Sequence, residues 1–357
     1  MNDWNNKTVV LGLTGGISAY KALELIRRWR ELGARVIPMA TPAALEFVTP
    51  LSIQSLAGEP LHQDLMAPTR ELDMSHIRLA RDADLLVIAP ATADTLSKMA
   101  HGRAEDLVSA GYLARRGPTL VAPAMNEAMW DHPATWRNVD RLREDGVWMV
   151  GPGTGSLACG EEGTGRLAEA VDIIEAGHRA LSENPLAGKR ILITAGPTRE
   201  ALDPVRYLSN HSSGLMGYWV ATAALRLGAQ VDWVAGPMEI DPPLGADITH
   251  VESANEMFEC ARALWPRCHA AVLTAAVADY RPQAYAESKI KKGVDDDAIS
   301  MELLKNPDIL ATLAKERDSR QLVVGFAAET DDVLANARAK LIKKGCDLIV
   351  AKIGRAH

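Results

Sequence analysis

Three side chains in the first half of the chain have types suited to chemistry. Cys159 lies in the glycine-rich stretch Gly155–Arg166, His76 in Met74–Arg78, and Asn126 in Pro123–Trp130. A thiol in such a loop can reach into a site, a histidine can move protons near neutrality, and an asparagine can donate a hydrogen bond to a carboxylate. The alternatives are an incidental surface cysteine and a structural histidine. Each residue alone leaves both interpretations open.

Two further stretches offer backbone groups and small side chains. Gly15-Gly16-Ile17-Ser18 follows an apolar run, and Ser18 could cap the helix that follows. Free backbone N–H groups at a helix start suit a phosphate, although glycine there can also serve only the turn. Pro90–Thr95 carries small residues and hydroxyls, which would let a flat ring lie against the backbone. Tight packing of strand on helix would need the same residues.

The second half presents groups that suit anions. Ser212, Ser213 and Gly214 precede an apolar helical segment, with Arg206 nearby, and together they predict an anion cradle. Lys289-Ile-Lys-Lys292 could clamp a triphosphate, although a run of charge is usually a solvated face. The segments Lys305–Asp308 and Lys340–Lys344 add further candidates.

Parallel strands and crossover helices must position these residues. Lys7–Thr14 is an almost continuous apolar run, typical of a strand buried on both faces. A helix with apolar residues at helical spacing follows and ends at Gly33, before a second strand at Arg35–Ala40. Further strands are expected at Asp84–Ala89, Thr119–Ala122 and Val147–Val150. In such a doubly wound sheet, ligands lie beyond the carboxyl ends of the strands.

The same pattern then restarts. Lys189–Thr198 aligns with Lys7–Gly16 at an offset of 182, and Leu227–Val231 aligns with Leu32–Val36 at an offset of 195. The difference predicts 13 extra residues between the first strand and its helix in the second half. Its later strands recur near Leu322–Phe326 and Asp347–Val350. The sequence therefore predicts two Rossmann-like α/β domains in tandem, residues 1–181 and 189–351, joined by a linker at 182–188.

Composition limits the classes of function. A length of 357 residues suggests two domains. The net charge of −7 and the pI near 5.8 argue against general binding to nucleic acid. There is no run of eighteen apolar residues, and the N-terminus lacks the regions of a signal peptide. The four cysteines form no ligand cluster. We therefore expect a cytoplasmic protein with reduced thiols, and neither a membrane nor a nucleic-acid partner.

Nine sequence motifs, taken together and in order, indicate a protein family more specifically than any single motif does. The chain contains GGISAYK, HIRLARDADLLVIAPATAD, PAMNEAMW, GSLACGEEGTGR, ITAGPTREALDPVRYLSNHSSG, AAVADYRP, KIKK, KNPDI and GFAAET. In these motifs it closely resembles the bifunctional phosphopantothenoylcysteine decarboxylase / phosphopantothenate–cysteine ligase family of coenzyme A biosynthesis. The resemblance covers about residues 7 to 351.

For the first half, the resemblance implies an FMN-dependent decarboxylase. Flavin would oxidise the substrate thiol, which makes loss of carbon dioxide possible, and would return the hydride afterwards. His76 would act as base or charge partner, Asn126 would hold the substrate carboxylate, and Cys159 would protonate the product. The residues implied for FMN are Gly15, Gly16, Ile17, Thr41, Thr92, Ala93, Asp94, Thr95 and Ala124.

For the second half, the resemblance implies a ligase that activates 4′-phosphopantothenate with CTP and joins it to cysteine. Asn210 would handle the acyl-cytidylate, and Mg²⁺, with unassigned ligands, would accompany CTP. The residues implied for CTP are Asp279, Lys289, Pro307, Asp308, Ile309, Leu310, Phe326, Lys340 and Lys344. The family also implies small-molecule substrates and a homo-oligomer, with decarboxylase trimers in dodecamers and ligase dimers.

The chain departs from the family after Ala351. The segment 352–357 back-translates as AAG ATC GGA AGA GCA CAC, which resembles a sequencing adapter, so we expect these six residues to be non-native. Three alternative functions are a decarboxylase with a defective ligase half, a flavin-fold regulatory binding protein, and a peptidyl-cysteine decarboxylase. Joint presence of His76, Asn126 and Cys159 argues against the pure binder, and residues 189–351 argue against the peptidyl enzyme.

Overall fold

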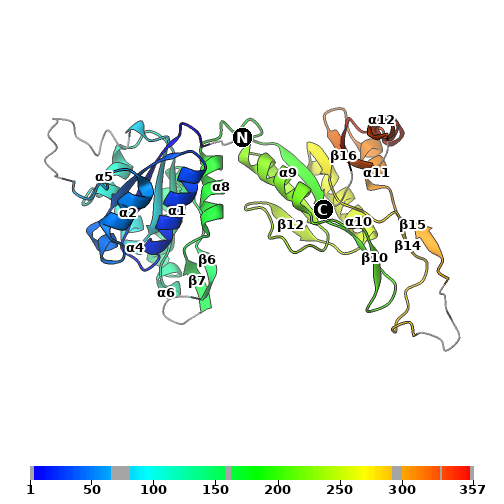
Figure 1. Ribbon diagram of the computed structural model, residues 1–357, viewed down its shortest axis with the longest axis horizontal. Helices are drawn as coiled ribbons and strands as arrows, with labels where there is room; N and C mark the ends of the chain where they lie inside the picture. The colour runs from blue at the N-terminus through cyan, green and yellow to red at the C-terminus, as the bar shows by residue number, and fades with distance from the viewer. Residues whose placement is uncertain (1–3, 66–80, 157–161, 292–299, 330–331, 354–357) are drawn as a thin grey trace. The chain divides into compact units, whose positions relative to one another are not determined.

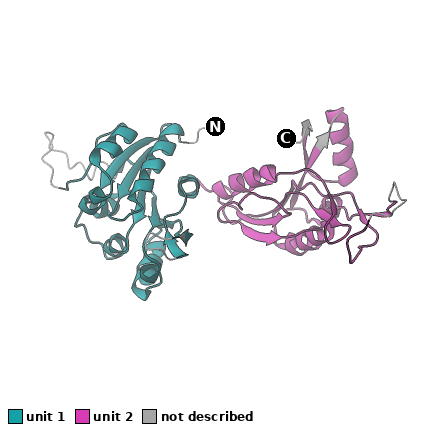
Figure 2. Cartoon of the chain, turned by 60° about the horizontal axis from the view of Figure 1, so that its bottom comes forward, with its two compact units in different colours: residues 1–182 teal, residues 183–357 magenta. Residues whose placement is uncertain are grey.

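The computed structural model describes residues 4–65, 81–156, 162–291, 300–329 and 332–353. The chain divides into two compact units, Met1–Ser182 and Glu183–His357, coloured separately in Figure 2. Each unit contains a parallel sheet with helices packed on it (Figure 1), so the predicted tandem α/β fold is confirmed. Among the described residues, no helix combines the length and apolarity needed to cross a membrane.

The first unit has a five-stranded parallel sheet in the order β2-β1-β3-β4-β5. Its strands are β1 Thr8–Leu13, β2 Arg35–Ala40, β3 Leu85–Ala91, β4 Thr119–Pro123 and β5 Trp148–Met149. The helices are α1 Ala19–Glu31, α2 Pro50–Ala57, α4 Ala93–Ala100, α5 Leu107–Ala114, α6 Glu127–Trp130, α7 Pro133–Glu144 and α8 Ala170–Ala180, with the 3₁₀ turn η1 at Pro42–Glu46.

Strand β1 is apolar throughout because both faces of the sheet are covered. Val9, Leu11 and Leu13 belong to one core, which also contains Trp29 of α1, whereas Val10 belongs to the core on the opposite face. A strand with one solvated face would instead alternate apolar and polar residues. One local expectation was wrong: Ser18 has helical backbone angles and makes no side-chain cap, so α1 begins without a hydroxyl cap.

The two described ends of the stretch Gly155–Arg166 lie in strands rather than in the expected glycine-rich loop. Strands β6 Gly153–Ser156 and β7 Glu162–Arg166 pair antiparallel on either side of residues 157–161. Their glycines support this ribbon because Gly155 and Gly165 have φ of 147° and 159°, which side-chain-bearing residues rarely adopt. Cys159 lies outside the described residues.

The second unit has a six-stranded parallel sheet in the order β12-β11-β8-β13-β16-β17. Its strands are β8 Arg190–Ala195, β11 Gln230–Ala235, β12 Asp247–His250, β13 Ala270–Leu273, β16 Leu322–Glu329 and β17 Leu348–Ile353. The helices are α9 Leu215–Arg226, α10 Ala254–Leu264, α11 Ile309–Glu316 and α12 Val333–Lys344, with the 3₁₀ turn η2 at Trp265–Arg267. Strand β12 was not predicted, because its four side chains are all exposed and show no apolar run.

The inserted residues of the second half form a hairpin. Strands β9 Arg199–Ala201 and β10 Tyr207–Ser209 pair antiparallel, directly after β8. A second short ribbon joins β14 Tyr280–Pro282 to β15 Leu303–Lys305. Sequence alignment of the two halves located the insertion but not its strands.

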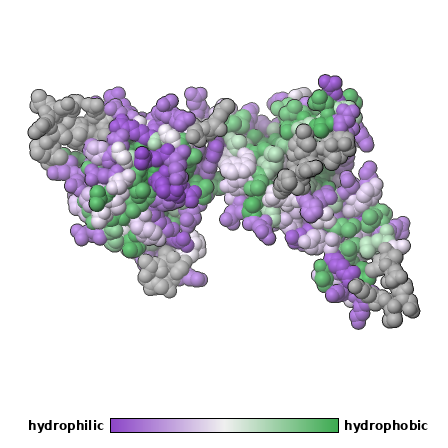
Figure 3. Space-filling model, viewed as in Figure 1, coloured by the Kyte–Doolittle hydropathy of each residue, from purple (hydrophilic) through white to green (hydrophobic). Residues whose placement is uncertain are grey.

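Helix α12 has little buried surface. Ala337 is its one buried residue, while Leu334 and Ile342 are exposed. Figure 3 shows hydrophobic surface on the second unit in the region where Figure 1 labels α12. Strand β17 extends two residues past Ala351, because Lys352 and Ile353 continue its register against β16.

Candidate functional site

A cavity of about 1150 Å³ in the first unit is lined by the turns that follow β1, β2, β3 and β4. Parallel strands end at a common edge of the sheet, so segments far apart in sequence meet there. Asn126 and all nine residues expected to bind FMN line this cavity: Gly15, Gly16, Ile17, Thr41, Thr92, Ala93, Asp94, Thr95 and Ala124.

The two glycines after β1 play different steric roles. A Cβ on Gly15 would lie 2.4 Å from Cβ of Ala43, so this turn can approach the segment after β2 only without a side chain. A Cβ on Gly16 would meet only Cγ2 of Thr92, at 3.8 Å. Gly15 is therefore required for packing, whereas Gly16 leaves open space against the cavity.

Hydrogen bonds hold the wall formed by the start of α4. Thr92 caps this helix by accepting from the Thr95 amide at 3.2 Å, and the two hydroxyls lie 3.0 Å apart. The Thr14 hydroxyl donates to the Pro90 carbonyl at 2.6 Å and accepts from the Thr92 amide at 3.2 Å. The ends of β1 and β3 are thus joined, and the wall has a defined shape.

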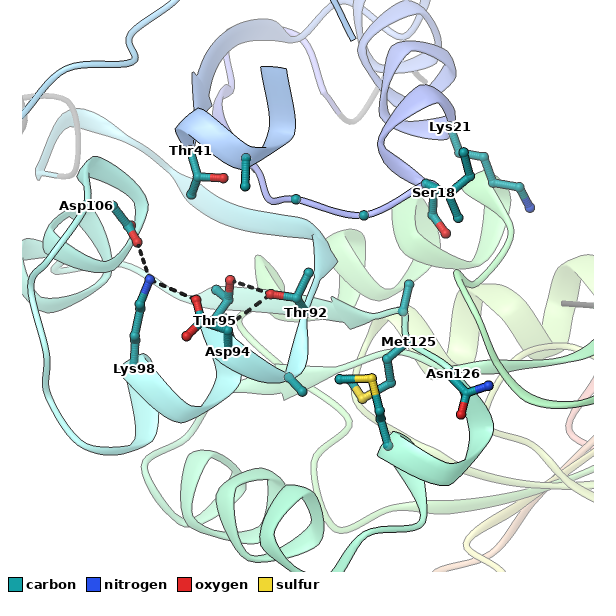
Figure 4. Close-up of a pocket in the computed structure, with 18 of the residues that line it drawn as sticks. Ser18, Lys21, Thr41, Thr92, Asp94, Thr95, Lys98, Asp106, Met125 and Asn126 are labelled. Atoms are coloured by element: carbon teal, nitrogen blue, oxygen red, sulfur yellow. Dashed lines mark hydrogen bonds and ion pairs between the residues drawn. The ribbon is translucent and has the colours of Figure 1, made fainter. Parts of the chain in front are cut away.

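Lys98 brings a positive charge to the same wall (Figure 4). Its ammonium lies 2.8 Å from an Asp94 oxygen and 3.2 Å from an Asp106 oxygen, and the Asp94 hydrogen bond is the main reason that the pKa of Lys98 is raised. Asp106 is fixed in turn, because it accepts from the Ser109 amide at the start of α5. Lys98 was not among the residues predicted for this site, although Asp94 and Lys98 have the four-residue spacing of a helical ion pair.

The ribbon β6–β7 contacts the turn that carries Asn126. The Met125 amide donates to the Gly165 carbonyl at 2.9 Å, and Glu127 Oε1 accepts from the Thr164 amide at 3.2 Å. Asn126 Oδ1 accepts from the Ala128 amide at 2.9 Å and caps α6. The strands on either side of residues 157–161 are therefore held beside the cavity. Cys159 and His76 themselves lie outside the described residues.

In the second unit, Asn210 lies against the loop after β13. Its Nδ2 donates to the Val277 carbonyl at 2.9 Å, and the Ala278 amide donates to Thr198 Oγ1 at 3.0 Å. Asp279 follows in the same loop, and its carbonyl accepts from the Asn306 amide at 2.8 Å. The structure thus brings together Asn210 and the loop that carries Asp279.

The predicted anion cradle lies at the start of α9. Gly214 has a φ of 77°, and the Gly214 amide donates to the Ser212 hydroxyl at 3.3 Å. A Cβ on Gly217 would lie 2.4 Å from Cβ of Ala195, so the first turn of α9 packs closely on the end of β8. Ser213 and Gly214 therefore sit at the carboxyl edge of the sheet, where a ligand is expected.

A second cluster of expected CTP residues lies between β16, α11 and α12. Lys344 forms an ion pair with Asp308, and Lys340 donates to the Phe326 carbonyl at 2.9 Å. Asp308 also caps α11 by accepting from the Ala311 amide at 3.0 Å. Burial alone would raise the pKa of Asp308, but the hydrogen bond from Lys344 and that amide outweigh it and hold the pKa low. Pro307 precedes Asp308, and Ile309 and Leu310 follow it in this cluster.

The Arg206 side chain is bonded to the backbone of the residue that follows Lys289. The Arg206 guanidinium donates through Nη2 to the Ile290 carbonyl at 2.6 Å, next to the exposed Lys289. Arg206 was expected to bind an anion; here its Nη2 holds a backbone carbonyl, and the anion contact stays a prediction.

A hollow of about 480 Å³ in this unit contains none of the predicted ligase residues. Its lining comprises Arg199, Trp233, Ala235, Gly236, Pro237, Met238, Ile240, His250, Val251, Glu252 and Glu256. Within the described ranges, no group of three or more His, Cys, Asp or Glu side chains could hold a metal ion. The expected Mg²⁺ ligands therefore stay unassigned.

Comparison with known proteins agrees with this two-unit organisation. The sequence profile of the Flavoprotein family matches residues 2–181, and that of the DNA/pantothenate metabolism flavoprotein C-terminal domain matches residues 186–356. The coenzyme A biosynthesis bifunctional protein CoaBC of Escherichia coli strain K12 is 46% identical over 97% of this chain and 86% of its own length. The protein of the same name from Bacillus subtilis strain 168 is 42% identical over 99% of this chain and 87% of its own length.

Two solved structures that resemble this chain each cover about half of it. A C-terminal domain of coenzyme A biosynthesis bifunctional protein CoaBC is 45% identical, with TM-score 0.42, over 47% of this chain and 79% of its own. The FMN-binding protein AtHal3 is 34% identical, with TM-score 0.43, over 47% of this chain and 93% of its own. Relatives that are 42–46% identical match almost the whole of this chain. The chain therefore belongs to the family of bifunctional coenzyme A biosynthesis proteins.

Proposed function

We propose that this bifunctional enzyme carries out two consecutive steps of coenzyme A biosynthesis. The second unit joins 4′-phosphopantothenate to cysteine with CTP, and the first unit decarboxylates the product, 4′-phospho-N-pantothenoylcysteine, to 4′-phosphopantetheine. The observation that supports this best is the 1150 Å³ cavity, because one site gathers every expected flavin residue together with Asn126. No observation favours the decarboxylase-only or regulatory alternatives.

The residues of the cavity fit FMN. Its volume exceeds that of an ordinary small-ligand site, roughly 300–1000 Å³. Gly16 leaves space for close approach of a ligand to the backbone, and Thr92 with Thr95 offers hydroxyls on a preformed wall. Gly15, Gly16, Ile17 and the Thr92–Thr95 segment would hold the cofactor. Bound there, FMN supplies the reversible two-electron chemistry that makes a cysteine-derived carboxylate able to lose carbon dioxide.

The residues of the first unit would orient the substrate and move protons. Asn126 Oδ1 accepts a hydrogen bond within α6, so its Nδ2 is the group able to donate to the substrate carboxylate. His76 would take the proton that leaves the thiol, and Cys159 Sγ would return one to carbon. The contacts of Met125 and Glu127 with β7 support this role for Cys159, because they keep both strands that flank it beside Asn126.

The residues of the second unit would neutralise phosphate charge and orient the acyl group. Lys289, Lys340 and Lys344 supply cations for a nucleoside triphosphate, and Mg²⁺ would reach the site with CTP. Ser212, Ser213 and Gly214 would receive an anionic group at the start of α9. Asn210, fixed on the Val277 carbonyl, would orient the activated carboxyl group while the cysteine amine attacks.

A crossed experiment tests both halves in one chain. The purified protein is incubated with 4′-phosphopantothenate, cysteine and CTP, and pyrophosphate and carbon dioxide are followed separately. Asn126→Asp keeps the oxygen that caps α6 but lacks the donor, so pyrophosphate release should persist while carbon dioxide release falls. Asn210→Asp should lower the steady-state release of pyrophosphate and, because no substrate then reaches the first unit, of carbon dioxide as well; carbon dioxide release should return when phosphopantothenoylcysteine is supplied.

Two results would contradict the proposal. One is carbon dioxide release from Asn126→Asp at the wild-type rate, and the other is pyrophosphate release that does not depend on 4′-phosphopantothenate. Assembly belongs to the same proposal: trimer-based dodecamers of the first unit, joined by paired second units, predict a single large species in sedimentation velocity.

A further inference from the structure

A fully buried carboxylate lies in the turn between β9 and β10. The Asp203 side chain has no exposed surface. Its Oδ1 accepts from the amides of Val205 and Arg206, both at 2.8 Å, and its Oδ2 accepts from the Ile290 amide at 3.1 Å. The first two bonds shape the turn itself. The third reaches a residue 87 positions away in sequence.

Arg206 binds the other backbone polar group of Ile290, its carbonyl. Its Nη2 donates to the Ile290 carbonyl at 2.6 Å, and its Nε lies 3.6 Å from Asp203 Oδ2. Both backbone polar groups of Ile290 are therefore bound by one ion pair. A further bond, from the Ala286 amide to the Leu202 carbonyl at 3.0 Å, fixes the chain four residues earlier.

These bonds replace regular secondary structure where it is absent. Residues 283–291 have no helix or strand, and Lys289 and Lys291, on either side of Ile290, are exposed. Burial would raise the pKa of Asp203, but the amides of Val205, Ile290 and Arg206 outweigh burial and lower it. The carboxylate is therefore charged under physiological conditions, and hydrogen bonds to charged groups are about twice as strong as neutral ones.

We propose that Asp203, together with Arg206, is a positioning residue for the ligase reaction, which fixes the backbone of Ile290 so that Lys289 is presented to the phosphates of CTP. This inference rests on the proposed role of Lys289 in CTP binding. We call the bonds from Asp203 and Arg206 to Ile290 the Ile290 clamp. Without this clamp, the lysine segment would have to become ordered at each binding event, and CTP affinity would fall.

Glu200 provides a matched control. It is also a buried carboxylate of the inserted hairpin, with 3% of its surface exposed, and it also accepts from a backbone amide, that of Ala254 at 2.9 Å. That amide begins α10, so the bond holds a helix rather than the lysine segment. Glu200→Gln therefore reproduces the loss of a buried charge without touching Ile290.

The first measurement needs no activity. Amide hydrogen exchange at Ile290, and tryptic cleavage after Lys289, should be about 10-fold faster in Asp203→Asn than in the wild type, because a hydrogen bond to a charged group is lost. Glu200→Gln should leave both rates unchanged. Arg206→Gln keeps the turn bonds of Asp203 and removes one donor to Ile290, so it should act in the same direction even where Asp203→Asn folds poorly. Unchanged rates in both clamp variants would overturn the proposal.

The second measurement asks whether Asp203 acts through Lys289. In the otherwise wild-type chain, Asp203→Asn should raise the KM for CTP by about 10-fold with a smaller change in kcat, since about 1.4 kcal/mol of binding corresponds to a factor of ten. In a Lys289→Ala background the same substitution should change KM by less than about 2-fold. Equal factors in both backgrounds would show a merely structural role.

Failure of the proposed ligase function would give a different result from failure of the positioning role of Asp203. If the wild-type chain released no pyrophosphate, the ligase assignment would fail, and CTP binding measured by calorimetry would replace KM in the same double-mutant cycle. Exchange at Ile290 would still decide whether the clamp exists.

Discussion

Gly15→Ala should distort the part of the flavin cavity that is formed by the turns after β1 and β2. The added methyl group would lie 2.4 Å from Cβ of Ala43 and 3.0 Å from its backbone carbon. Carbon atoms in contact normally lie about 3.5–4.0 Å apart. The turn after β1 or the segment after β2 must therefore move by about 1 Å, and both segments line the cavity.

The size of the effect follows from this overlap. Overpacking a well-packed site costs about 1–3 kcal/mol. For a unit of 182 residues, each kcal/mol lowers Tm by about 2–4 °C, so the unit without flavin should lose about 2–12 °C. If the wall moves to relieve the strain, part of the cost appears as weaker FMN binding, at about tenfold per 1.4 kcal/mol.

Gly16→Ala is the matched control. Its methyl group would meet only Cγ2 of Thr92, at the ordinary contact distance of 3.8 Å. The apoprotein should keep its Tm within about 2 °C, since changes away from packed features usually cost less than about 0.5 kcal/mol. FMN affinity should nevertheless fall, because the new group occupies space on the cavity side.

Thermal unfolding of the apoprotein and a flavin titration followed by absorbance separate these effects. The expected pattern is a lower Tm for Gly15→Ala alone and weaker FMN binding for both variants. Equal stability of Gly15→Ala and the wild type would refute the steric argument. Unchanged FMN binding in both variants would show that this turn does not face the cofactor.

Three further predictions follow from other contacts. Gly165→Ala places a Cβ 2.2 Å from a backbone carbonyl and should slow carbon dioxide release at least about 10-fold. Gly163→Ala meets the end of the Glu127 side chain, which can move at the cost of its bond to the Thr164 amide, and should be milder in the same assay. Lys98→Met leaves two carboxylates without their shared cation, so the unfolding free energy or the free energy of FMN binding should fall by about 1.5–3 kcal/mol. Lys98→Arg keeps the positive charge and should largely avoid this loss. Asp308→Ala should cost about 1 kcal/mol more than Asp308→Asn, which can still cap α11, in denaturant unfolding. Because the folded pKa of Asp308 is lowered below 3.8, the stability it contributes should be complete above that pH and lost as the pH falls through the lowered value.

Local patterns predicted much of the site because turns at strand ends have a local signature. Gly15, Gly16 and Thr92–Thr95 could be placed at the carboxyl ends of β1 and β3 from apolar runs and the residues that interrupt them. Parallel topology then brings those ends together without any further information. The same reasoning placed Asn210 in an insertion after the first strand of the second half.

Contacts between side chains and distant backbone were not predictable in this way. The Asp94–Lys98 spacing was visible, but the third member of that group, Asp106, joins it only because α5 begins beside α4. The ribbon β6–β7 was expected to be a loop, because glycine-rich sequence carries no strand pattern. Its order comes from pairing with itself and from contacts with Met125 and Glu127.

The sequence by itself determined the tandem α/β architecture, the family, and the turns that surround the cavity, because each depends on short-range patterns and their order. Only the tertiary structure showed that Gly15 is required by Ala43 while Gly16 is open, and that Asp203 and Arg206 hold Ile290 from both sides. The reason is physical. Steric overlap and hydrogen bonding depend on distances between atoms, and the fold, not the order of residues, sets those distances.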